Sequence, residues 1–150
     1  IRLSLVGSEM CIRDRYLAEQ SGRLLPADPQ ARWQAIQWLM FQAASVGPIL
    51  GQRVHFEIFA ATALPAAIER YRRLCDEAFG VLDRQLARHP FLAGHDYSIA
   101  DIAHFGWTHI ARVIDFDFSG HAHLSAWHDR VASRPAVRRG VTLPAPAVGP

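Results

Sequence analysis

Residues 97–114 read YSIADIAHFGWTHIARVI, and this stretch decides the fold class. Ser98 and Asp101 have the spacing of a capping box, in which the serine hydroxyl binds a backbone N–H of the first helical turn and the carboxylate reaches back to the serine N–H. Apolar residues follow on most faces of the helix that this box opens: Ile102, Ala103, Phe105, Trp107, Ile110, Val113 and Ile114. A helix that is apolar nearly all round is buried. We therefore expect this helix to form the centre of the core.

Helical spacing continues on the N-terminal side of this stretch. Asp28 followed by Pro29 predicts a helix start, because an aspartate caps free backbone N–H groups and a proline fits the first helical position. The helix from Pro29 is apolar on every side, which indicates burial against more than one neighbour. Gly47–Pro48 should kink it, since a proline removes one backbone hydrogen bond and clashes with the preceding turn.

Two further helices complete the predicted fold. One runs from about Pro65 to about Arg88 and carries a single broad apolar stripe. The other follows Ser119–Gly120 and ends near Arg134–Pro135. No stretch alternates apolar and polar residues for long enough to predict a strand. The chain is therefore predicted to be an all-α bundle of five or six helices.

The composition describes one globular domain and excludes several kinds of chemistry. Of 150 residues, 50% are hydrophobic and 20% are charged, and the formal net charge is +2. All 16 basic residues are Arg, and both Lys and Asn are absent. A Schiff-base lysine, a phosphate-binding P-loop lysine and an N-glycosylation site are thus excluded. The small net charge, with arginines spread along the chain, argues against a nucleic-acid partner or an anionic membrane. No apolar run reaches the roughly 18 residues that span a bilayer.

The first fifteen residues, IRLSLVGSEMCIRDR, differ from the rest. From Ser4 onward they closely resemble the in-frame translation of a transposon-end adapter used in sequencing libraries, so we expect residues 1–15 to be an artefact. The alternative is a genuine helix that leads into Tyr16. Without this segment one cysteine remains, Cys75, on an apolar helix face. That position predicts an inert core thiol, and we expect a reducing, cytoplasmic location.

Several motifs resemble the C-terminal helical domain of the cytosolic glutathione transferases. The resemblance begins with FLAG at 91–94 and YSIADIA at 97–103. It continues at the end of the domain with Leu124, Trp127, Arg130, Arg134–Pro135 and Val137. Three further stretches resemble the bacterial Nu class, which includes disulfide-bond oxidoreductases: QWLM at 37–40, GPILGQ at 47–52 and AIERY at 67–71. The resemblance covers nearly all of residues 16–142.

The resemblance implies that the chain is one part of a two-domain protein. Residues 16–28 resemble the last helix of the family's thioredoxin-like N-terminal domain and the linker that follows it. Residues 29–142 resemble the helical domain, and residues 143–150 are expected to form a disordered tail. In this family the N-terminal domain holds the glutathione thiol. No catalytic residue is therefore expected in this chain, which should be inactive on its own.

The activity that the resemblance implies depends on glutathione as co-substrate. The parent protein is expected to conjugate glutathione to a hydrophobic electrophile or to reduce a disulfide, as a homodimer. The arginine of the IERY stretch contacts glutathione in the Nu-class pattern, and it corresponds to Arg70. Ser98 and Asp101 are expected to be structural. Candidates for the pocket of the hydrophobic co-substrate are Phe41, Gln52, His55 and Phe56. The alternative role for each of these four is ordinary packing.

Two other functions stay open at this point. Eight histidines suggest a metal site, above all His121, His123 and His128. This set supplies three ligands, whereas a closed tetrahedral site needs four. A second pair, His104 and His109, points about 140° apart on a helix. No metal is therefore expected. The second alternative is a non-catalytic relative in which the same fold serves ligand binding or protein interaction, because a fold does not determine a function.

Overall fold

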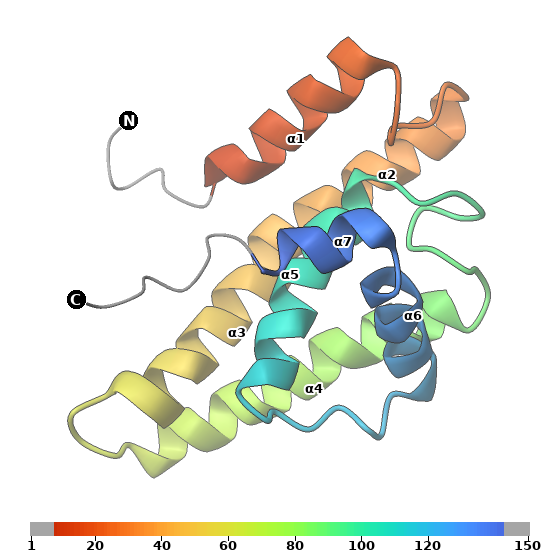
Figure 1. The fold of residues 1–150 in the computed structure, drawn as a ribbon. Coiled ribbons are helices and arrows are strands. Elements are labelled where there is room, and N and C mark those ends of the chain that lie inside the picture. Colours follow the sequence, from red (N-terminus) through yellow and green to blue (C-terminus); the bar gives the residue numbers. More distant parts are fainter. Residues whose placement is uncertain (1–7, 143–150) are drawn as a thin grey trace.

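The computed structural model describes residues 8–142, and Figure 1 shows that they form a bundle of helices. The elements are α1 (Ser8–Ser21), α2 (Pro29–Phe41), the π-helical turn η2 (Gln42–Val46), α3 (Gly47–Val54), the π-helical turn η3 (His55–Phe59), α4 (Pro65–Leu86), α5 (Ile99–Val113), α6 (Ala122–Ala132) and α7 (Pro135–Gly140). The described residues contain no strand, only an isolated bridge between Phe91 and Gly94. The prediction of an all-α bundle is confirmed.

The segment from α2 to η3 forms one long rod, drawn in orange to yellow in Figure 1. It begins as predicted, because the Asp28 carboxylate accepts a 2.8 Å hydrogen bond from the Ala31 N–H and Pro29 occupies the first turn. A kink was expected at Gly47–Pro48. The structure has a π-helical turn, η2, directly before these two residues. In that turn the Gly47 N–H donates to the Gln42 carbonyl. A wide turn of this kind inserts one extra residue into an α-helix.

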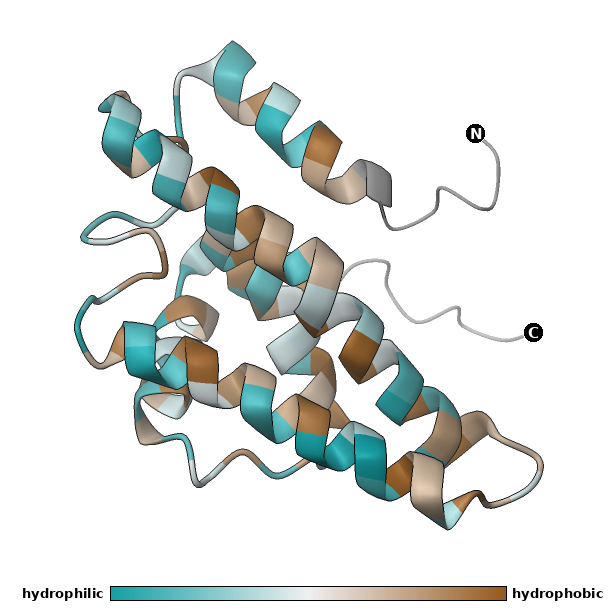
Figure 2. Ribbon diagram, turned by 180° about the vertical axis from the view of Figure 1, so that it is seen from behind, coloured by the Kyte–Doolittle hydropathy of each residue, from teal (hydrophilic) through white to brown (hydrophobic). Residues whose placement is uncertain are grey.

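Burial of the α2 helix is one-sided, which corrects the prediction. Leu39 is 1% exposed and faces the bundle, whereas Trp33 is 69% and Met40 is 51% exposed. Figure 2 shows hydrophobic and hydrophilic residues interleaved along the rod. The expectation that α2 is buried against several neighbours is therefore wrong at Trp33 and Met40. A helix with apolar residues on every side is fully buried only where neighbouring elements cover all of its sides.

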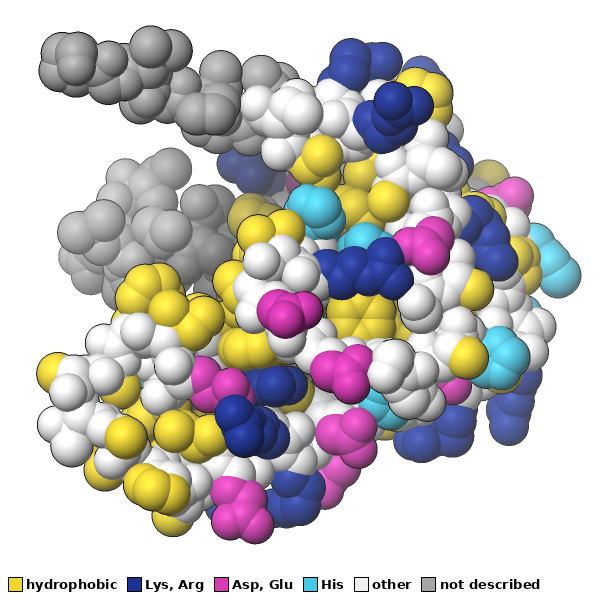
Figure 3. Space-filling view, turned by 60° about the horizontal axis from the view of Figure 1, so that its bottom comes forward, with side chains coloured by type: hydrophobic (Ala, Val, Ile, Leu, Met, Phe, Trp, Pro, Cys, Tyr) yellow, Lys and Arg dark blue, Asp and Glu magenta, His cyan; other side chains and the backbone are white. Residues whose placement is uncertain are grey.

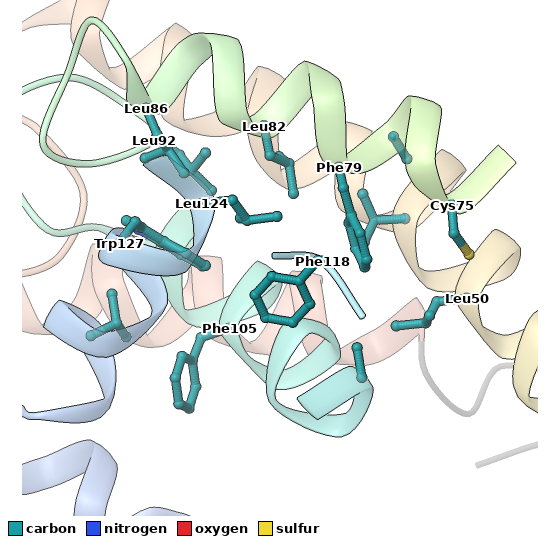
Figure 4. Close-up of a cluster of buried hydrophobic side chains, with 14 of the residues drawn as sticks. Leu50, Cys75, Phe79, Leu82, Leu86, Leu92, Phe105, Phe118, Leu124 and Trp127 are labelled. Atoms are coloured by element: carbon teal, nitrogen blue, oxygen red, sulfur yellow. The ribbon is translucent and has the colours of Figure 1, made fainter. Parts of the chain in front are cut away.

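Helix α5 is the central helix, as predicted. It packs against α1, α2, η2, α3 and α6. The main core is built from the rod, α4, α5, α6 and the loops that join them. The members labelled in Figure 4 are Leu50, Cys75, Phe79, Leu82, Leu86, Leu92, Phe105, Phe118, Leu124 and Trp127. Burying one large apolar side chain stabilises the fold by about 1.5–3 kcal/mol.

A smaller cluster joins α1 to the bundle. It comprises Cys11, Ala18, Leu39, Ile99 and Ala103. The Cys11 thiol also donates to the Gln42 side-chain oxygen at 3.1 Å. Helix α1 runs without interruption through residues 15 and 16, so the expected end of the adapter-like segment does not coincide with a structural boundary. The artefact origin of residues 1–15 stays a prediction from the amino-acid letters. The predicted tail, residues 143–150, lies outside the described residues.

Both halves of the predicted capping box are present at the start of α5. The Ser98 hydroxyl accepts from the Ala100 N–H at 3.3 Å, and the Asp101 carboxylate accepts from the Ser98 N–H at 3.0 Å. The same carboxylate also accepts from the Leu92 N–H at 3.0 Å. Asp101 thereby ties the loop before α5 to the helix, in addition to capping it.

Candidate functional site

Arg70 lies in the first half of α4 and is exposed to solvent. Its guanidinium forms no hydrogen bond or ion pair with any residue that the structure describes. Arg73, one turn further along the same helix, differs, because it forms a 2.6 Å ion pair with Glu77. An exposed guanidinium without an internal partner is available to an external carboxylate, and such pairs are often bidentate.

A charged cluster fixes α4 to the rod just after Arg70. Glu57 in η3 accepts two hydrogen bonds from Arg72, each 3.0 Å long, and one of 2.8 Å from Arg53. The side chains of Arg53 and Glu57 are each 12% exposed. Burial alone would raise the pKa of Glu57, but the hydrogen bonds from Arg72 and Arg53 outweigh it and hold the pKa below its usual value. The carboxylate is therefore charged at neutral pH and holds η3 against α4.

Two of the predicted pocket residues, His55 and Phe56, lie beside this cluster. Their ring centroids are 5.1 Å apart, and the Phe56 ring also stacks on Tyr71 at 5.5 Å, with an interplanar angle of 16°. Tyr71 follows Arg70 directly in the sequence. His55 is exposed, as is Gln52 one turn earlier. The structure therefore places His55 and Phe56 next to the helical segment that carries Arg70.

Phe41 does not join this group. It is half-buried and lies between α2 and α5, where its ring stacks on His104 at 6.2 Å and meets the edge of Trp38 at 5.7 Å. His104 is fully buried and its Nδ1 lies 2.9 Å from the Ala100 carbonyl. Phe41 is thus part of the interior packing of two helices, far along the rod from Gln52.

Exposed apolar residues that the sequence analysis did not single out lie at the η3–α4 end of the molecule. Ile58 is 47%, Phe59 72% and Leu64 50% exposed. Figure 3 shows hydrophobic side chains gathered at this end, beside charged side chains of both signs. Their apolar character was readable in the sequence, but their exposure depends on which elements surround them.

The sequence analysis also missed a groove of about 440 Å³ between the rod and α5. Its walls are mostly apolar and comprise Met10, Gln42, Ala43, Gly47, Pro48, Ile102, Ala103, Gly106, Trp107 and Ile110. The Gln42 side chain is 7% exposed and contributes the buried amide of the groove. The sequence does contain small residues on the rod and a tryptophan on α5. Their spacing along the chain, however, does not show that the small residues and the tryptophan face each other.

Gly47 allows the Trp107 ring to lie directly on the rod. A Cβ atom at Gly47 would lie 3.0 Å from the Gln42 amide nitrogen and 3.2 Å from the Trp107 indole ring. Gly51, one turn later, leaves more room, because a Cβ there would lie 3.8 Å from the same ring. A Cβ atom at position 47 would therefore make the Gln42 amide or the indole ring shift, where the sequence had suggested only a kink.

The cysteine and histidine side chains do not form a redox or metal centre within residues 8–142. Cys75 is 1% exposed, and burial raises the pKa of its thiol to about 11, which makes it a poor nucleophile. Both Cys11 and Cys75 are free thiols. No group of three or more potential metal ligands converges in this part of the chain. None of its helices is long and apolar enough to cross a membrane.

Comparison with known proteins identifies the family. The family model described as "Glutathione S-transferase, C-terminal domain" matches residues 55–135, which is more than half of the chain. The chain belongs to this glutathione S-transferase family. Among curated relatives, it is 39% identical over 121 residues to the disulfide-bond oxidoreductase YfcG of Escherichia coli, covering 81% of this chain and 56% of the relative. It is 37% identical over 133 residues to the disulfide-bond oxidoreductase YghU of the same organism, covering 83% and 46%.

Solved glutathione transferases have the same helical arrangement. One from Burkholderia graminis, with two glutathione molecules bound per subunit, superposes with a TM-score of 0.84 at 32% identity, covering 91% of this chain and 60% of that one. One from Pseudomonas putida, with one glutathione disulfide bound per subunit, gives 0.80 at 35% identity, covering 89% and 61%. The chain spans about half the length of the curated glutathione transferase relatives that it matches.

Proposed function

We propose that this chain is the helical half of a glutathione-dependent enzyme that transfers glutathione to a hydrophobic electrophile or reduces a disulfide. The observation that carries the proposal is the similarity, at 39% and 37% identity, to two proteins named disulfide-bond oxidoreductases. The glutathione and glutathione disulfide present in similar solved structures support glutathione as the co-substrate. The chemistry common to both reactions is attack by the glutathione thiolate on an electrophilic carbon or on a disulfide sulfur.

In this proposal Arg70 binds a carboxylate of glutathione. Its exposed guanidinium makes no pair within the described chain, so binding would cost no internal ion pair. The neighbouring cluster supports the role, because Glu57 holds Arg72 and Phe56 stacks on Tyr71, which together fix the helix on which Arg70 stands. A rigid helix positions a binding residue more precisely than a loop does.

We assign the hydrophobic co-substrate to the surface around Phe56. Gln52, His55 and Phe56 lie on consecutive turns of α3 and η3, and Phe56 supplies an aromatic face beside Tyr71. Phe41 does not lie on this surface, because it packs on His104. Ser98 and Asp101 keep a structural role, which their hydrogen bonds to the backbone support.

The thiol-activating group is assigned to a thioredoxin-like half that is outside this chain. We propose that residues 16–28 are its last helix and linker, that residues 29–142 form the helical domain, and that residues 1–15 are adapter-derived. The turn and bends after Ser21 and before Pro29 support a linker there. The chain alone is expected to give no turnover. The parent enzyme is expected to be a cytoplasmic homodimer, and exposed Trp33 and Met40 on α2 supply apolar surface for an interface.

The test is calorimetric titration of glutathione into the full-length parent and its Arg70→Ala variant. Loss of a charge-assisted hydrogen bond costs about 1.5–3 kcal/mol, so the affinity should fall about ten- to a hundredfold. Arg73→Ala is the matched control, because Arg73 is also an exposed arginine of α4 but pairs with Glu77. Equal affinity in wild type and Arg70→Ala would remove the binding role. Binding of glutathione without turnover of any electrophile or disulfide would favour a non-catalytic module.

A further inference from the structure

Three aromatic rings stack between α5 and α6. Phe105 and His109 stand one turn apart on α5, with ring centroids 5.3 Å apart and an interplanar angle of 19°. His128 of α6 stacks on Phe105 at 4.9 Å and on His109 at 5.8 Å, where the two imidazoles are within 11° of parallel. The Phe118 ring meets the edge of His128 at 6.1 Å. Two titratable rings therefore take part in the contact that joins these helices.

The absence of hydrogen-bond partners around His128 among residues 8–142 favours a neutral imidazole at this position. His128 is 3% exposed, and neither of its ring nitrogens has a hydrogen-bond partner within the described residues; the same holds for Nδ1 of His109. The nearest carboxylate, that of Asp129, lies 3.6 Å from His128 Nδ1. That carboxylate is already bound by the Arg112 guanidinium, which also donates to the Ser125 hydroxyl at 2.8 Å.

The charged and titratable groups that face His128 act in both directions. Helix α5 contributes His109 and the Arg112 guanidinium, and α6 contributes the Asp129 carboxylate, which also binds Arg112. The segment between the helices contributes only the Phe118 ring. Burial lowers the pKa of His128, and Arg112 acts in the same direction. The Asp129 carboxylate acts in the opposite direction, but burial is the larger effect and the pKa of His128 stays below its ordinary value. A proton on His128 would thus place a cation against a second imidazole in a poorly solvated contact.

We propose that the His109–His128 stack is an acid-sensitive joint that holds α6 on α5 only while His128 is neutral. Acidification releases α6 before the other helices, because the buried His128 ring must reach water in order to be protonated. Helix α6 also carries Trp127, which donates to Asp101, so the joint couples the protonation of His128 to the loop before α5. The sign follows from the lowered pKa of the folded state. Stability is fully present above the ordinary histidine pKa and is lost as the pH falls below it.

Urea unfolding of the full chain at several pH values between 8 and 5 tests the proposal. The slope of the unfolding free energy against pH reports the protons taken up on unfolding. Below about pH 6 we expect the His128→Phe variant to take up fewer protons on unfolding than wild type, since phenylalanine keeps an aromatic ring at this position and cannot be protonated. His123→Phe is the matched control, because His123 lies on the same helix and is exposed. This control should keep the wild-type slope.

A second variant and a second measurement cover a failure of His128→Phe to fold. His128→Leu also removes the imidazole and should reduce the slope in the same way. In wild type, amide hydrogen exchange in α6 should accelerate between pH 7 and pH 5.5, beyond the intrinsic pH dependence, while exchange in α4 does not. Equal slopes in wild type and in whichever stack variant folds would overturn the proposal. So would α6 exchange that follows only the intrinsic pH dependence.

Discussion

The indole N–H of Trp127 in α6 donates a 2.8 Å hydrogen bond to the carboxylate of Asp101 in α5. Both side chains are fully buried. The same carboxylate accepts from the backbone of Leu92 and of Ser98. Burial raises the pKa of Asp101, and these hydrogen bonds act in the opposite direction. One buried side chain therefore caps α5, fixes the preceding loop and anchors α6, so its donors should contribute strongly to stability.

Trp127→Phe is expected to destabilise the chain by about 1.5–3 kcal/mol, because a donor to a buried carboxylate is lost and the smaller ring leaves a space in the core. The measurement is the midpoint and slope of urea unfolding followed by circular dichroism. Trp33→Phe serves as control, since Trp33 is 69% exposed and a surface change of this kind shifts stability by less than about 0.5 kcal/mol. Equal effects of the two substitutions would contradict the role of the Trp127–Asp101 bond.

Two glycine-to-alanine substitutions on the rod should have opposite signs. Gly47→Ala should destabilise by about 1–3 kcal/mol, because its Cβ would press on Gln42 and Trp107. Gly51→Ala should stabilise by up to about 1 kcal/mol, since alanine is the better helix former and its Cβ meets the ring at an ordinary distance. Thermal unfolding of both variants checks the prediction, and a stabilising Gly47→Ala would mean that the ring is free to move.

Glu57→Gln should destabilise by about 1–3 kcal/mol, because it leaves the mostly buried guanidinium of Arg53 without a counter-charge. Glu77→Gln is the control. The Glu77 carboxylate also pairs with an arginine, Arg73 on the preceding turn, but both side chains are more than half exposed. Such pairs contribute about 0–1 kcal/mol. Urea unfolding of both variants at low and at high salt separates the two effects.

His104 should make the chain less stable in acid. Burial lowers its pKa to about 4 from the ordinary value of 6.5. The unfolded chain takes up the proton first, so the stabilisation present above pH 6.5 decreases as the pH falls toward 4, by about 3 kcal/mol in total. His104→Leu should flatten the stability profile in this range. An unchanged profile would show that His104 has the same pKa in the folded and the unfolded chain.

The helices were predictable because their signals are local. Asp28–Pro29 and the box of Ser98 and Asp101 act within one turn, and each caps the helix that it was expected to start. The central position of α5 followed from its apolar faces. The same reasoning failed at Trp33 and Met40, because periodicity describes which faces are apolar but not which faces another element covers.

The candidate site was only partly predictable for the same physical reason. Spacing on α3 and η3 brought His55 and Phe56 together, and the structure adds Tyr71 as their neighbour on α4. Phe41 was grouped with them, yet it packs on His104 in the interior. Residues on one rod can face different partners along its length, and spacing does not show which partner each of them meets.

By itself, the sequence determined the fold class, the helix starts and the family resemblance, since caps, periodicity and short motifs act along the chain. Only the tertiary structure decided that Asp101 also binds Trp127, that Gly47 lies against Trp107 and that His109 stacks on His128. Each of these relationships joins residues on different elements. Their geometry depends on how the helices pack, and close packing selects one arrangement from many that the same apolar patterns allow.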